Sequence, residues 1–119
     1  MISLSPQTRI YVFPESVDFR NGLDGLVALA KLKTREDPFC GALFVFRNRG
    51  KTAIKAVAYD GQGFWLFMKR LSAGKFQHWP KPASNEAHVR LLARELSVLL
   101  WNGDHGQARM REDWKKLAP

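Results

Sequence analysis

The sequence predicts an α+β fold, in which a mostly antiparallel sheet of four to five strands packs against two to three helices. Three apolar runs between residues 42 and 68 are short and rich in β-branched and aromatic residues, which favours strands. On both sides of them, apolar residues recur at the spacing of a helix face. The 119 residues are predicted to form a single domain, 1–119. Its sheet and first helix lie within 8–80, and a helical C-terminal part spans 84–119.

The three apolar runs are predicted to pair as an antiparallel meander. They cover residues 42–46, 53–59 and 64–68. The segments 48–50 and 60–63 separate them and have the Asn, Asp and Gly content of hairpin loops. Because side chains alternate along a strand and both faces here are apolar, one helix cannot cover the sheet. A second helix or another subunit is therefore expected on the other face.

The N-terminal part is predicted to hold one more strand and the first helix. Residues 9–13 are a short strand that ends before Pro14. Residues 21–33 are a helix, for which Asp18 is a plausible capping residue. Its buried face is expected to consist of Leu23, Leu26, Val27 and Ala30.

The C-terminal part is predicted to be mainly helical. Residues 75–79 are a candidate fourth strand of the meander. A helix is expected from Ser84 or Asn85 to Trp101, ended by glycines. Its apolar arc is wide enough to be buried on two sides. A third, amphipathic helix is expected in the tail, with Met110, Trp114 and Leu117 on one face.

Composition limits the classes of partner and compartment. The net charge of +8 favours nucleic acid as a partner, although anionic lipid or an acidic protein surface would also fit. The single Cys40 excludes an intramolecular disulfide and suits a reducing cytosol. No secretory signal is visible, and no apolar run approaches the ~20 residues of a membrane span. The protein is therefore expected in the cytoplasm, without a membrane partner.

Basic residues concentrate in the region of the three runs, where Asp60 is the only acid between Arg47 and Lys81. Those at loop tips can reach phosphates and are expected to be exposed, with little effect on stability. We expect two patches, one at the first hairpin and one after the third run, at the opposite end of the sheet. The candidate nucleic-acid-binding residues are Arg20, Arg47, Arg49, Lys51, Lys55, Lys69, Arg70 and Lys75.

Aromatic residues in the runs have two explanations. Single-strand binders stack bases on exposed aromatic rings, and Phe44, Phe46, Trp65 and Phe67 have the right chemistry. Burial in the core explains the same residues more simply.

The sequence does not favour a catalytic site. The three histidines are scattered and show no metal-ligand spacing. Metal-dependent DNA chemistry needs clustered carboxylates, and the acids of this region are spread along the chain as Asp18, Asp24, Asp37 and Asp60. We therefore expect no catalytic residue, no metal and no cofactor. A metal-dependent nuclease is the less favoured alternative, and it would require these acids to meet in the fold.

Several motifs in order resemble one known family. They include Asp18-Phe19-Arg20-Asn21-Gly22, the segment LFVFRNR at 43–49, Asp60-Gly61-Gln62-Gly63 and Trp79-Pro80. The chain resembles the accessory protein, called TnpB or ORF2, of the insertion sequence 66 family of bacterial transposable elements. The resemblance covers residues 8 to 80 and is weak from Asn85 onward. It implies an accessory role in DNA transposition, beside a larger transposase encoded by the same element.

Together, these observations predict a non-catalytic protein that binds DNA electrostatically, with little sequence preference, or bridges to the transposase, or does both. The alternative is a pure protein–protein adaptor whose basic patches dock on an acidic surface of the transposase. Arg20 is expected either to pair with Asp24 one helical turn away or to contact an anion without supporting the fold. The apolar faces of the sheet and of the C-terminal helix also favour a homodimer.

Overall fold

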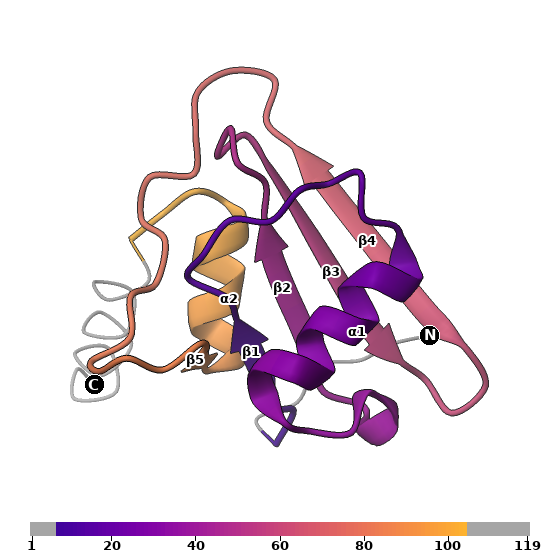
Figure 1. The fold of residues 1–119 in the computed structure, drawn as a ribbon. Helices are drawn as coiled ribbons and strands as arrows, with labels where there is room; N and C mark the ends of the chain where they lie inside the picture. Colours follow the sequence, from indigo (N-terminus) through magenta and orange to yellow (C-terminus); the bar gives the residue numbers. More distant parts are fainter. Residues whose placement is uncertain (1–6, 105–119) are drawn as a thin grey trace, which may run out of the picture.

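The computed structural model describes residues 7–104, which form one five-stranded sheet with an α-helix on each face (Figure 1). The order of the strands across the sheet is β4-β3-β2-β1-β5. In chain order the elements are β1 (Ile10–Val12), α1 (Leu23–Thr34), the short 3-10 helix η1 (Pro38–Cys40), β2 (Leu43–Arg47), β3 (Ala53–Tyr59), β4 (Phe64–Arg70), β5 (Val89–Leu91) and α2 (Ala93–Leu100). The predicted α+β fold with a mostly antiparallel sheet is confirmed.

The meander consists of β2, β3 and β4, as the three apolar runs predict. At its centre, Val57 of β3 lies opposite Phe44 of β2 on one side and Leu66 of β4 on the other. The hairpin between β3 and β4 is closed by the carboxylate of Asp60, which accepts hydrogen bonds from the backbone N–H groups of Gln62 and Gly63. Such side-chain-to-backbone bonds explain why Asp favours hairpin loops.

The first strand lies in the interior of the sheet and runs parallel to β2, with Ile10 beside Leu43. Parallel neighbours need a crossover connection, and α1 provides it. The helix begins at Leu23 after Gly22, which caps it without a side-chain hydrogen bond. The prediction that Asp18 caps this helix is therefore wrong. Its carboxylate instead accepts hydrogen bonds from the backbone and side chain of Arg20.

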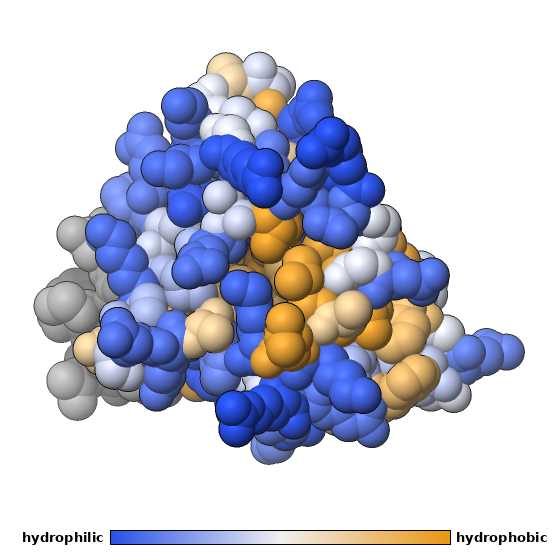
Figure 2. All heavy atoms as spheres, in the orientation of Figure 1, coloured by the Kyte–Doolittle hydropathy of each residue, from blue (hydrophilic) through white to orange (hydrophobic). Residues whose placement is uncertain are grey.

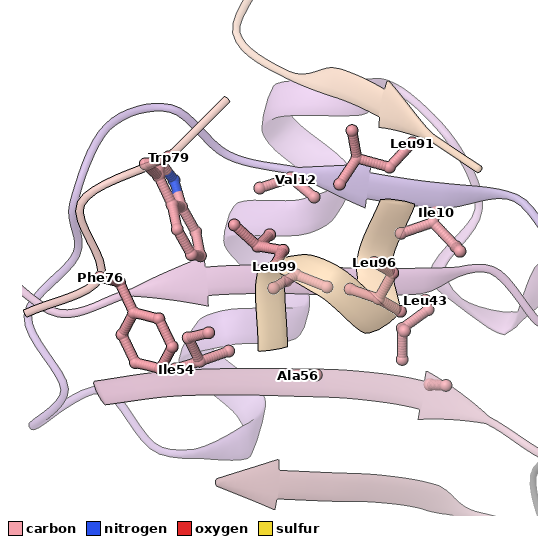
Figure 3. Close-up of a cluster of buried hydrophobic side chains, with 12 residues drawn as sticks. Ile10, Val12, Leu43, Ile54, Ala56, Phe76, Trp79, Leu91, Leu96 and Leu99 are labelled. Carbon is pink, nitrogen blue, oxygen red and sulfur yellow. The ribbon is translucent and has the colours of Figure 1, made fainter. Parts of the chain in front are cut away.

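Both faces of the sheet are covered in its central part, each by a different helix. On the α1 face, Leu26 and Ala30 pack on a fully buried layer of aromatic and aliphatic side chains, which includes Phe13, Phe44, Phe46 and Val57. On the α2 face, Leu96 and Leu99 point from the helix onto the strands (Figure 3). The strand residues beneath them are Ile10, Val12, Leu43, Ile54 and Ala56. The expected second covering element is therefore α2.

The prediction of a helix from Ser84 or Asn85 to Trp101 is wrong for the first half of this segment. Residues 89–91 form β5, in which Leu91 pairs with Ile10 of β1. The helix begins only after Leu92, whose backbone N–H donates to the carboxylate of the buried Glu95. Pairing with β1 provides hydrogen-bond partners along one side of residues 89–91, and Leu91 is buried, so tertiary pairing overrides the local helical pattern.

Residues 71–88 contain no strand, so the prediction of a strand at 75–79 is also wrong. Phe76 and Trp79 are nevertheless buried in the core of the α2 face. The indole N–H of Trp79 donates to the carbonyl of Phe13 at 2.8 Å, which fixes this loop to the end of β1. The predicted tail helix lies outside the described residues. Within residues 7–104, no helix is long and apolar enough to cross a membrane.

Candidate nucleic-acid interface

The basic loops of the meander lie at one end of the sheet. Arg70 at the end of β4 pairs with Ala53 at the start of β3, and Arg47 at the end of β2 pairs with Ile54. In a meander, the end of the first strand, the start of the second and the end of the third share one sheet end. The expectation of two patches at opposite ends is therefore wrong, because these strand termini are direct neighbours.

The first hairpin is held in shape by Asn48. Its side-chain oxygen accepts hydrogen bonds from the backbone N–H groups of Thr52 and Ala53, at 2.8 and 3.0 Å. Lys51, near the tip, has a φ of 63°, in the left-handed region. Its carbonyl accepts a hydrogen bond from the N–H of Phe76, which brings the segment that carries Lys75 against the hairpin. From sequence, Asn48 is predicted only as one residue of a hairpin loop, of which Asn is typical.

The segment before α1 lies against the same hairpin. Val17 pairs with Asn48, and its N–H donates to the carbonyl of Arg47. This pairing places Arg20 near Arg49, around a shallow recess of about 410 Å³. The recess is lined by Val17, Asp18, Phe19, Arg20, Asn48, Arg49 and Gly50. Residues almost 30 positions apart in the sequence therefore share one surface.

Five of the eight candidate residues are exposed on this side of the molecule, and we call them the basic end. They come from the segment before α1, the first hairpin, the end of β4 and the loop that follows it. The basic end consists of Arg20, Arg49, Lys51, Arg70 and Lys75.

Arg47 is not a free surface charge, contrary to the expectation from sequence. Its guanidinium lies 4.9 Å from the centre of the Trp79 ring and donates to the carbonyl of Phe76 at 3.0 Å. Burial lowers the pKa of this guanidinium from its ordinary value. Arg47 therefore ties the loop after β4 to the end of β2, and its removal would disturb the fold as well as the charge.

Lys55 and Lys69 also make contacts within the protein. The ammonium group of Lys55 donates to the carbonyl of Phe19 at 3.0 Å and lies over the ring of the same residue. Lys69 donates to the carbonyl of Leu100, in the last turn of α2, and lies 4.8 Å from the centre of the Trp101 ring. A cation at a helix C-terminus stabilises the helix through a favourable interaction with the helix dipole. A role for either lysine in nucleic-acid binding remains a prediction.

Arg20 pairs with Asp18 and not with Asp24. The Nη2 atom of Arg20 lies 2.6 Å from Oδ2 of Asp18. Hydrogen bonds from Arg20 lower the pKa of the Asp18 carboxyl to about 2. The positive charge of Arg49, which lines the same recess, makes a smaller contribution in the same direction. The Arg20 side chain is 89% exposed, so an external anion can reach it.

We expect Arg20→Ala to raise the pKa of Asp18 toward its ordinary value of 3.8. Because the native pKa is depressed, the Asp18 contact stabilises the fold above the unfolded pKa, and this contribution is lost as the pH falls toward about 2. NMR titration of the side-chain carboxyls measures the shift directly. Asp60, whose pKa is also lowered to about 2 but by Gly63, Gln62 and Trp65, should not change. An unchanged Asp18 would contradict the pairing.

The aromatic candidates divide into two groups. Phe44 and Phe46 are fully buried under α1, in agreement with the core explanation. Trp65 and Phe67 are about half exposed on β4, where their rings stack with centres 5.9 Å apart. The indole N–H of Trp65 donates to Asp60, so this pair lies at the acidic hairpin and not at the basic end.

Of the four acids that a metal-dependent nuclease would require to meet in the fold, three have a local structural role. Asp18 pairs with Arg20, Asp37 accepts a hydrogen bond at the start of η1, and Asp60 closes a hairpin. In the part of the chain that the structure describes, no group of three or more His, Cys, Asp and Glu residues is placed to hold a metal ion.

Similarity to known proteins extends over most of the chain. Residues 8–110 match the model of a family described as IS66 Orf2 like protein, so the match continues past residue 80, through β5 and α2. Two proteins of Sinorhizobium fredii, both described as uncharacterized, are similar to this chain. The protein y4jC is 37% identical over 100 residues, which is 84% of this chain and 83% of the relative. The protein y4hO is 32% identical over 100 residues, or 84% of each chain. No solved structure matches.

Proposed function

Because this chain belongs to the family of IS66 Orf2-like proteins, which are accessory proteins of transposition, we propose that it binds DNA through its basic end. The observation that carries the proposal is the convergence of five exposed basic residues, from four segments of the chain, on one end of the sheet. Phosphate contacts fix a protein on DNA without reading its sequence. Clustered Lys and Arg side chains provide such contacts.

The elements at the basic end favour binding with little sequence preference. The candidate side chains lie on hairpins and loops, and a helix or ribbon in the major groove is the usual reader of base edges. We infer that the protein recognises the duplex backbone and that the transposase supplies the choice of site. In this proposal, the protein holds DNA and bridges it to the transposase of the same element, and it performs no catalysis itself.

The salt dependence of binding tests the proposal. The logarithm of affinity for duplex DNA falls with the logarithm of salt concentration, with a slope of about −0.9 per phosphate contact. If all five residues of the basic end contact phosphates, we expect a slope of roughly −4.5. Fluorescence anisotropy with labelled duplexes of unrelated sequence, at several salt concentrations, measures both the slope and the sequence preference. A slope near zero, or no binding near physiological salt, would contradict the proposal.

The alternative function is that of a protein adaptor with no DNA contact. A pull-down from cells that carry the whole element, with and without nuclease treatment, separates the two functions. Transposase that is recovered only without nuclease indicates a bridge through DNA. Transposase that survives nuclease, combined with no DNA binding by the purified protein, favours the adaptor.

A further inference from the structure

Strand β4 is an open edge of the sheet with apolar side chains on both faces. Within residues 7–104, β3 is the only strand that pairs with it. The four residues from Trp65 to Met68 are all exposed, from 41% at Leu66 to 52% at Met68. Figure 2 shows hydrophobic residues gathered over α1 and toward β4, inside a hydrophilic surround. Monomeric proteins usually protect a long edge strand with charge, proline or a bulge, and residues 64–68 contain no charge and no proline.

The hydrogen-bond pattern defines which groups of β4 are free. Asp60 donates to Gly63 before the strand, and Leu71 donates to Thr52 after it. Along an antiparallel ladder, hydrogen-bonded pairs alternate with non-hydrogen-bonded pairs. Residues 65, 67 and 69 of β4 are therefore the ones that are hydrogen-bonded to β3. The even residues of β4 therefore direct their N–H and C=O groups outward. They are Phe64, Leu66, Met68 and Arg70.

We propose that β4 is the interface with a second copy of this chain, whose own β4 adds antiparallel to form a continuous ten-stranded sheet. The free even residues must lie opposite even residues of the other copy, because only these carry unpaired groups. Among such registers, the one with Phe67 of both copies on the two-fold axis pairs all seven residues of each strand. In this register, Leu66 lies opposite Met68, and Trp65 lies opposite Lys69.

The charge distribution along β4 fits an antiparallel second copy. Lys69 and Arg70 lie at one end of the strand, and the ionised Asp60 lies in the hairpin at the other end. Antiparallel pairing brings Lys69 and Arg70 of each strand toward the hairpin of the other copy that contains Asp60. It also avoids like charges directly opposite each other, which destabilise a strand pair. A parallel arrangement would instead bring the lysines and arginines of the two copies together.

A groove beside the strand extends the apolar surface. It has a volume of about 300 Å³ and opens between β4 and α2. Its apolar lining includes Val45, Ile54, Ala56, Phe67, Leu96 and Leu100. In the proposed register, Phe67 of the second copy adds an aromatic ring next to this groove, on the same face of the sheet. The two basic ends would then point away from each other, whether or not they bind DNA.

Charge substitutions at Phe67 test the interface. In sedimentation equilibrium at micromolar concentration, we expect the wild type at twice the 13.6 kDa mass of the chain. Phe67→Glu and Phe67→Lys each place like charges opposite each other, so each variant alone should be monomeric. An equal mixture of the two should recover the dimer. Leu32→Lys, at an exposed apolar residue of α1 away from this edge, should remain dimeric. A monomeric wild type, or a mixture that stays monomeric, would overturn the proposal.

Cysteine crosslinking tests the register without disturbing charge. Residues opposite each other in a non-hydrogen-bonded antiparallel pair have Cα atoms about 4.5 Å apart, which permits a disulfide. In a Cys40→Ser background, Phe67→Cys should therefore form a covalent dimer under mild oxidation. Trp65→Cys should not, because Trp65 of the two copies would be about 13 Å apart along the strands. Crosslinking at residue 65 and not at residue 67 would exclude the register centred on Phe67.

Discussion

Replacing Trp79 with alanine should lower the free energy of unfolding by about 3–5 kcal/mol, as expected for loss of a large buried aromatic side chain. Trp79 is 7% exposed and packs against Phe76 in the core of the α2 face. Its indole N–H bonds to the carbonyl of Phe13, which alanine would leave without this donor. The guanidinium of Arg47 lies over its ring and would lose that contact as well. Urea unfolding followed by circular dichroism measures the change.

Trp101→Ala is the matched control for this measurement. Trp101 is 84% exposed and contacts the ammonium group of Lys69. Since exposed cation–π contacts contribute only about 0.5–1 kcal/mol, this substitution should have a much smaller effect. If the two substitutions lowered the free energy of unfolding equally, the loop after β4 would not be anchored through Trp79.

The second large effect is expected for Arg49→Ala combined with Arg70→Ala. Loss of two phosphate contacts should flatten the salt slope by about 1.8 and weaken duplex binding roughly thirtyfold near 0.15 M salt. All sequences should be affected alike, because these residues contact the backbone. Stability should hardly change, since both side chains are exposed.

The control for this double variant removes the same charge elsewhere. Lys31 lies in the last turn of α1, and Arg90 lies on β5, at the edge of the sheet opposite β4. Lys31→Ala with Arg90→Ala should reduce affinity only slightly and leave the slope near its wild-type value. If both double variants weaken binding equally, net charge and not the basic end determines affinity. If neither changes binding, the basic end is not the DNA surface.

Local sequence patterns predicted most of the central architecture. The β-branched and aromatic runs, separated by Asn, Asp and Gly, correspond to β2, β3 and β4. The helical spacing of Leu23, Leu26 and Ala30 corresponds to the inner face of α1. The apolar character of both sheet faces correctly indicated cover on both sides. These features follow from periodicity and turn chemistry, which are properties of neighbouring residues.

Pairing between distant segments decides the features that differ from the sequence-based predictions. Residues 89–91 have a helical pattern, but β1 offers them a free edge, and strand pairing prevails. Arg47 has the sequence context of an exposed loop charge, yet Trp79, 32 positions later, folds back under its guanidinium. Nothing near Arg47 in the sequence identifies this partner.

The sequence by itself determined the fold class, the excess of positive charge and the family to which the chain belongs. Only the tertiary structure decided which basic residues are exposed to a partner and which support the fold. Strand register brought Arg70 beside the first hairpin, and the bridge at Val17 brought Arg20 to the same end. Lys55 and Lys69 were instead drawn to backbone carbonyls of distant segments. A long basic side chain reaches whichever partner the packing places near it, and that partner depends on contacts between segments far apart in the chain.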